Sequence, residues 1–155
     1  MMGVGKTTLG KQLAKQLLYS FIDLDNEIEK QAGISIPQIF EQFGEVYFRE
    51  LEHKILLQTI ERNDIVISTG GGAACYYNNM QWMNEHGKTI YLKANTAFIL
   101  SRVTPNLTKR PLLKGKSPAE LDAFVSELLY QRQSFYEQAH NVVLMPAKSL
   151  LEAIK

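Results

Sequence analysis

The segment GVGKT at positions 3–7 contains the first residues whose types and spacing could do chemistry. Phosphate-binding P-loops follow the pattern G-x-x-x-x-G-K-[ST], in which backbone N–H groups surround phosphates before a helix begins. Gly5, Lys6 and Thr7 match the end of this pattern, so we expect Lys6 to contact β- and γ-phosphates and Thr7 to bind Mg²⁺. ATP is favoured over GTP because no guanine-reading motif follows. The predicted nucleotide-binding residues of this segment are Gly3, Val4, Gly5, Lys6, Thr7 and Thr8.

The P-loop pattern is incomplete at its start. Its first glycine would lie one residue before Met1, and the β-strand that leads into such a loop does not precede it. A short G-x-G-K-T segment can also arise by chance in a turn, but here it opens an amphipathic helix whose N-terminus favours phosphate. We therefore expect phosphate binding, a sequence that begins after the first strand, and lower stability or activity than in a chain that carries this strand.

Two carboxylates, Asp23 and Asp25, flank Leu24 where a short apolar run from Ser20 ends. Open parallel sheets place their ligand crevice at the carboxyl ends of strands. Side chains two apart in extended backbone point the same way, so one carboxylate could lie near a metal ion and the other near an acceptor hydroxyl. The alternative is that Asp25 only caps a helix that closes at Gly33 and that Asp23 is solvated.

A glycine triplet and an arginine are further candidates. Gly70, Gly71 and Gly72 follow the apolar run DIVIST, and glycines allow a ligand to approach the backbone and its N–H donors. A tight turn is the alternative for the triplet. Arg49 lies one helical turn before Glu52, which could hold its guanidinium in place, although a surface ion pair is the alternative there.

The elements that must position these residues alternate between helix and strand. This order predicts parallel βαβ units and an α/β fold. Gly44 is expected to separate a short helix from a longer one, and the basic, proline-containing stretch at 104–117 is expected to form a flexible cationic lid. We expect strands at 20–23, 64–69, 88–93 and 141–144, and helices at 9–18, 25–33, 35–61, 78–86, 95–103, 117–138 and 147–154.

Length and composition limit the functional classes. The 155 residues fit one domain, and 45% hydrophobic with 21% charged residues is ordinary globular usage. A net charge of +1 gives no broad field that favours nucleic acid or an anionic membrane. We therefore expect small anionic partners, no nucleic-acid or membrane partner, and a cytoplasmic location, since neither an apolar run of eighteen residues nor a secretory signal occurs.

The conjunction of these motifs resembles shikimate kinase, a family of the nucleoside-monophosphate-kinase-like P-loop fold. The matching stretches are GVGKTTLGKQLAKQL, FIDLDNEIE, IPQIFEQFGEVYFRELE, VISTGGGA, RPLL and QRQSFYEQA, which lie between Met1 and about Leu144. The resemblance implies a single P-loop kinase domain over residues 1–155. Its small-molecule substrates would be ATP and shikimate, its cofactor would be Mg²⁺, and we expect a monomer. It also implies a three-layer α/β/α fold with a parallel sheet in the order 2-3-1-4-5, from which strand 1 is missing here.

The same resemblance assigns the acceptor and metal sites. It places the metal ligands on Thr7 and Asp23, and the carboxylate that activates the acceptor on Asp25. It places a clamp for the shikimate carboxylate on Arg49 and Arg132, and the backbone of the glycine triplet, chiefly at Gly71, along the ring. The family usually has a proline where this chain has Ser134, close to Arg132.

The remaining implied roles concern ATP. Arg110 in the lid would close over the phosphates, and Arg102 would lie beside the adenine. The implied reaction is phosphorylation of the 3-hydroxyl of shikimate, with Asp25, Lys6 and Arg110 as catalytic residues. Two alternatives stay open, namely a kinase for another small polyol acid such as gluconate, and a nucleotide-binding regulatory domain without activity.

Overall fold

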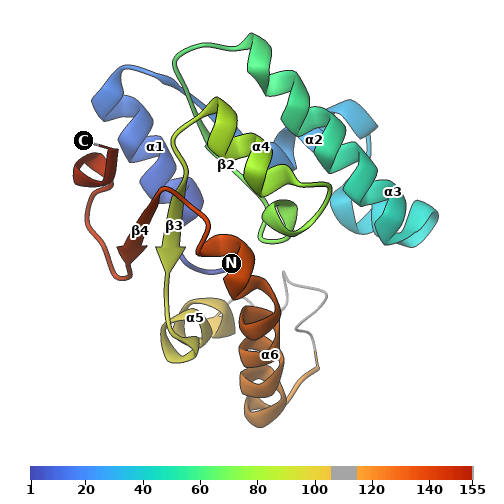
Figure 1. The fold of residues 1–155 in the computed structure, drawn as a ribbon. Helices are drawn as coiled ribbons and strands as arrows, with labels where there is room; N and C mark the ends of the chain where they lie inside the picture. Colours follow the sequence, from blue (N-terminus) through green and yellow to red (C-terminus); the bar gives the residue numbers. More distant parts are fainter. Residues whose placement is uncertain (106–114, 155) are drawn as a thin grey trace.

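A computed structural model describes residues 1–105 and 115–154 of the chain (Figure 1). Arg110 and most of the predicted lid lie outside the described residues. Within the described part, no helix combines the length and the apolar character needed to cross a membrane.

In the part of the chain that the structure describes, four short parallel strands form two separate pairs. Strand β1 pairs with β2 so that Asp23 lies opposite Ser68, and β3 pairs with β4 so that Lys93 lies opposite Leu144. All four predicted strands are confirmed, and so is the α/β class. The strands are β1 Ser20–Asp23, β2 Ile65–Ser68, β3 Ile90–Lys93 and β4 Asn141–Leu144.

A cavity of about 640 Å³ lies between the two strand pairs. Val66 of β2 and both Tyr91 and Leu92 of β3 line it, together with Leu13 of the first helix and Met80 of the fourth. Among the described residues, no strand lies between β2 and β3. This is the place that the family order gives to strand 1, so the described chain has two sheets instead of the one predicted.

In the described residues, six α-helices and three 3-10 turns surround the strands (Figure 1). The predicted helix at 147–154 is wrong, because only a short 3-10 turn forms there. That segment buries Leu150 and only partly covers Leu151 and Ile154, and so short a segment with so little packing does not sustain an α-helix. The helices are α1 Lys6–Leu17, α2 Leu24–Ala32, α3 Ile36–Gln58, α4 Asn79–His86, α5 Thr96–Val103 and α6 Pro118–Tyr136, and the turns are η1 Thr59–Glu61, η2 Ala73–Cys75 and η5 Leu151–Ile154.

Helix α3 is interrupted at Gly44, as the sequence predicts. Gly44 has φ 80° and ψ 178°, a conformation that favours glycine and ends the regular helical backbone. The side chain of Gln38 reaches back to the N–H of Ser35 at 2.9 Å and starts the short first part of the helix. The longer second part carries Arg49 and Glu52 toward the interior.

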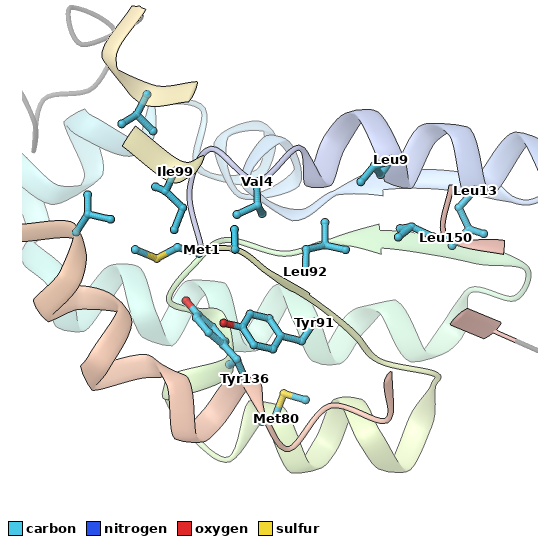
Figure 2. Packing of buried hydrophobic residues seen from close by; sticks show 14 of the residues in the cluster. Met1, Val4, Leu9, Leu13, Met80, Tyr91, Leu92, Ile99, Tyr136 and Leu150 are labelled. Carbon is cyan, nitrogen blue, oxygen red and sulfur yellow. The ribbon is translucent and has the colours of Figure 1, made fainter. Parts of the chain in front are cut away.

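Two groups of buried apolar side chains hold these elements in place. One group joins α2 to α3 through Leu24, Ile28 and Leu56, which are all fully buried. The other group surrounds the start of the chain, where Met1 and Val4 contact the interior (Figure 2). The P-loop is therefore held in place by its own apolar residues, Met1 and Val4, which pack in the interior.

Candidate active site

The P-loop is shaped by two glycines with left-handed backbone. Gly3 has φ 72° and Gly5 has φ 89°, and a Cβ at Gly3 would lie 2.8 Å from Cγ1 of Val103. Gly5 is the N-cap of α1, so the N–H groups of the first helical turn remain available to an anion. Lys6 Nζ donates a hydrogen bond to the Met1 carbonyl at 2.6 Å, which keeps the ammonium beside this loop.

Thr7 and Asp23 meet where the predicted metal site lies. The Thr7 hydroxyl donates to Oδ2 of Asp23 over 3.0 Å, and this bond joins the start of α1 to the end of β1. Mg²⁺ prefers oxygen ligands and commonly takes one or two from the protein, with the rest from phosphates and water. The donor set therefore fits Mg²⁺. No group of three or more His, Cys, Asp or Glu side chains in the described residues could hold a metal by itself.

Asp25 reaches the site from a helix and not from extended backbone. Helix α2 begins at Leu24 with Asp23 as its N-cap, so the predicted capping role of Asp25 is wrong. The argument from side chains two apart in a strand is wrong as well. Leu24 is fully buried, and its packing starts the helix one residue earlier than expected. The first turn of α2 then directs Asp25 toward the glycine triplet.

Residues 70–72, here called the glycine loop, approach a different charged side chain at each position. A Cβ at Gly70 would lie 2.9 Å from Oδ1 of Asp25, and a Cβ at Gly71 would lie 3.4 Å from Nη1 of Arg132. A Cβ at Gly72 would lie 2.6 Å from Nη2 of Arg49. None of the three has positive φ, so the space that each side chain occupies, and not backbone conformation, requires glycine here. The loop thus brings together the predicted base and both predicted clamp residues.

Arg49 is held rigidly below the glycine loop. Its Nη1 donates to Oε2 of Glu52 over 2.7 Å and its Nη2 to Oε1 of Glu45 over 3.2 Å. The guanidinium also lies 4.9 Å from the ring centre of Phe48 and 4.5 Å from that of Tyr76. Arg49 is 8% exposed and Glu52 only 1%, so the surface ion pair considered above is wrong.

Burial and charge shift the pKa values of these groups. Burial would lower the pKa of Arg49, but the charge of Glu52 and its hydrogen bond raise it above the ordinary value. Burial raises the pKa of Asp25, the neighbouring Asp23 raises it further, and Lys6 opposes the shift. Burial likewise raises the pKa of Glu52 against the opposing charge of Arg49. A carboxylate with a raised pKa suits proton transfer near neutral pH.

Of the three other arginines with predicted roles, two lie in the described residues and one does not. Arg132, on α6, lies beside Gly71 as described above. Arg102 lies in the last turn of α5, where its Cβ is 3.5 Å from the position of a Cβ at Gly3, so it neighbours the P-loop. Arg110 lies outside the described residues. The contacts of Arg102 with adenine and of Arg110 with phosphates stay predictions.

The structure adds two residues that the sequence interpretation missed. The Tyr136 hydroxyl donates a hydrogen bond to the Gly71 carbonyl. Asn79 Nδ2 donates to the Ala73 carbonyl over 2.8 Å, and Asn79 is fully buried. Tyr136 lies four residues after Arg132 and so on the same helix face, a spacing that could have indicated its place.

Comparisons with known proteins point to one family. The family model for shikimate kinase matches residues 2–154. The chain is 47% identical to the shikimate kinase of Parabacteroides distasonis, over 89% of this chain and 80% of that protein. It is 44% identical to that of Bacteroides fragilis, over 91% of this chain and 79% of the relative.

Solved structures give the same result. The crystal structure of shikimate kinase from Bacteroides thetaiotaomicron superposes with a TM-score of 0.89 at 41% identity, over 95% of this chain and 85% of that one. Shikimate kinase from Acinetobacter baumannii in complex with shikimate superposes with a TM-score of 0.86 at 35% identity, over 97% and 83% of the two chains. The chain therefore belongs to the shikimate kinase family.

Proposed function

We propose that the chain transfers the γ-phosphoryl group of ATP to the 3-hydroxyl of shikimate, giving shikimate 3-phosphate and ADP for aromatic amino-acid biosynthesis. One observation carries this proposal. Asp25, Arg132 and Arg49 lie against three successive glycines, within reach of a P-loop. An acceptor that has both a carboxylate and a hydroxyl matches two arginines and one carboxylate.

Each residue has a separate task in this proposal. Arg49 and Arg132 bind the carboxylate of shikimate, since a guanidinium offers a planar set of donors that matches it. Asp25 accepts the proton of the attacking hydroxyl. Its raised pKa makes it a better proton acceptor than an ordinary carboxylate. The acceptor is held with its hydroxyl directed at the γ-phosphate, and no covalent intermediate is needed.

The phosphate side depends on the P-loop. Lys6 and the N–H groups at the start of α1 stabilise the negative charge of the β- and γ-phosphates. Thr7 and Asp23 would hold Mg²⁺, which neutralises charge on the phosphate oxygens when it is bound. Arg110 closes over the phosphates and Arg102 contacts the adenine side in the same proposal.

The proposal includes the setting of the reaction. The chain works as a monomer in the cytoplasm, where ATP is available, and its partners are the two small-molecule substrates. It needs neither nucleic acid nor a membrane. The gluconate alternative is less favoured because the relatives that the chain matches are shikimate kinases.

A direct assay with matched variants tests the function. The chain is incubated with ATP, Mg²⁺ and either shikimate or gluconate, and phosphorylated product is measured by mass spectrometry. We expect shikimate 3-phosphate. Asp25→Asn should lower kcat by about 10²–10⁴-fold with ATP binding little changed, because an amide cannot take the proton. Asp122→Asn, the same change at an exposed position of α6, is the control.

Two outcomes would contradict the proposal. Faster transfer to gluconate would assign the other polyol acid as substrate. Binding of ATP or ADP without turnover of either acceptor would favour the regulatory alternative.

A further inference from the structure

The carbonyl groups of residues 70–73 are all engaged in hydrogen bonds. The first and third accept from amides of the following turn, at 3.3 and 2.9 Å. The second, at Gly71, accepts from the Tyr136 hydroxyl, and the fourth, at Ala73, accepts from Nδ2 of Asn79. Two of the four carbonyls are therefore fixed by side chains from different helices, α6 and α4.

The N–H groups of the glycine loop, in contrast to its carbonyls, have no hydrogen-bond partner in the described residues. Gly70 and Gly71 are only partly buried, so a ligand oxygen can reach this loop and accept from N–H groups that have no partner within it. With its carbonyls engaged and its amides available, the loop presents donors only. It therefore favours carboxylate and hydroxyl oxygens that accept, and it disfavours groups that can only donate.

We propose that Tyr136 and Asn79 are positioning residues for the acceptor. By binding the Gly71 and Ala73 carbonyls, they fix the peptide planes of the glycine loop so that its N–H groups point at the acceptor oxygens. This inference rests on the proposed function for the identity of the acceptor, but the state of the loop does not depend on it.

Tyr136 also couples the loop to the carboxylate clamp. It follows Arg132 by one helical turn, so the same part of α6 carries a clamp residue that lies beside Gly71 and a hydroxyl that holds the Gly71 carbonyl. The ring of Tyr136 packs against that of Tyr91 with centroids 5.1 Å apart (Figure 2). Burial raises the pKa of Tyr136 to about 12, so its hydroxyl keeps its proton and remains a donor.

The side-chain amide of Asn79 is itself held in place by His53. Its Oδ1 lies 2.6 Å from Nδ1 of His53, and with Nδ2 donating to Ala73 both ends of the amide are engaged. This orientation leaves the amide no freedom to flip, because flipping would place two acceptors against each other at Ala73.

The first test measures the loop without any substrate. Backbone ¹⁵N relaxation of the glycine loop is compared in the parent chain, Tyr136→Phe and Tyr91→Phe. Tyr91 is the matched control because it loses the same hydroxyl from the adjacent ring, and that hydroxyl makes no hydrogen bond in the described part of the chain. We expect order parameters of roughly 0.85 in the parent and the control, and below about 0.6 at Gly71 and Gly72 in Tyr136→Phe. Unchanged order parameters would overturn the inference, whatever the activity of the chain.

The second test measures where the effect falls in the reaction. Loss of a neutral hydrogen bond should raise the KM for shikimate roughly three- to tenfold in Tyr136→Phe, while the KM for ATP stays within about twofold. Asn79→Ala should give the same split and serves if Tyr136→Phe does not fold. Equal increases in both KM values, together with a lower melting temperature, would reduce Tyr136 to a packing residue. A mobile loop in Tyr136→Phe with no shikimate turnover in the parent would retain this inference and reject the proposed function.

Discussion

Gly72 lies so close to Arg49 that a methyl group on it would stand 2.6 Å from Nη2 and 2.8 Å from Cζ of the guanidinium. The atoms in the way belong to a side chain that two glutamates and two aromatic rings already hold. Arg49 therefore cannot move aside at little cost. The small size of one loop residue thus sets the position of the predicted carboxylate-binding group.

Gly72→Ala should displace the Arg49 guanidinium and weaken acceptor binding. A charged hydrogen bond contributes about 1.5–3 kcal/mol, so its loss predicts a KM for shikimate roughly tenfold to a hundredfold higher. The KM for ATP should change little. Gly87→Ala is the control, because a Cβ there meets nothing closer than 3.7 Å. Steady-state kinetics with each substrate varied in turn would check this, and an unchanged KM for shikimate would show that the close approach is tolerated.

The pH dependence of the reaction should report the environment of Asp25. Burial and the neighbouring Asp23 raise the pKa of this carboxyl, so activity should be lost as pH falls through a value above the ordinary 3.8. The acid limb of kcat/KM for shikimate measures this group in the free enzyme. Glu29→Gln should move the limb to lower pH, because Glu29 also raises the pKa of Asp25.

A control separates this shift from effects on the metal. Glu29 has no place in the proposed metal site, so the Mg²⁺ dependence of Glu29→Gln should match that of the parent. An acid limb at or below pH 3.8 would show that Asp25 is not the proton acceptor, or that its pKa is not raised.

The sequence predicted the parts of the fold that depend on short-range patterns. The P-loop residues, the four strands and the interruption at Gly44 follow from local glycine spacing and apolar runs. The start of α2 did not follow, because it depends on the burial of Leu24 against α3, which no neighbouring residue reveals. Hydrogen bonds between residues far apart in the sequence could not be predicted either. Tyr136 and Gly71 are 65 residues apart, and although the four-residue spacing from Arg132 places Tyr136 on the same helix face, it does not identify the Gly71 carbonyl as its partner.

The cavity between β2 and β3 should accept one added strand joined to Met1. The Cα of Met1 lies 3.6 Å from the position of a Cβ at Gly71, just past the carboxyl end of β2. A strand parallel to β2 and β3 would therefore end where Met1 begins. Burial lowers the pKa of the Met1 amino group, and the positive charges of Lys6 and Arg132 lower it further. Conversion of that amine into a peptide group removes a charge that is unfavourable there.

We expect an extension such as Val-Ile-Leu-Ile-Gly to raise the melting temperature by about 5–10 °C, since apolar burial stabilises by several kcal/mol. Amide exchange at Val66 and Leu92 should slow as the facing edges become paired. A Gly-Ser extension of equal length is the control. Equal melting temperatures and equal exchange for the two extensions would show that the cavity does not take up a strand.

Arg49→Lys should behave as a disruptive change although the charge is kept. Lysine is a compact point charge, and it cannot reproduce the separate bonds that Nη1 makes to Glu52 and Nη2 makes to Glu45 while a carboxylate binds. The KM for shikimate should rise roughly tenfold to a hundredfold, and the KM for ATP should move little. We expect kcat to fall as well, because an acceptor held by Arg132 alone can turn its hydroxyl away from Asp25.

The sharper measurement pairs this variant with a changed acceptor. A shikimate analogue with an uncharged group in place of the carboxylate should bind poorly to the parent chain. If Arg49 contacts that carboxylate, Arg49→Lys should add little further loss with the analogue, and a double-mutant cycle should give a coupling free energy close to the whole penalty of either change. Arg62→Lys is the matched control, since Arg62 is half-exposed and pairs with Glu27 away from the glycine loop. Fully additive penalties from the Arg49 and carboxylate changes would show that the guanidinium does not bind the acid group, and would leave Arg49 as a structural partner of Glu52.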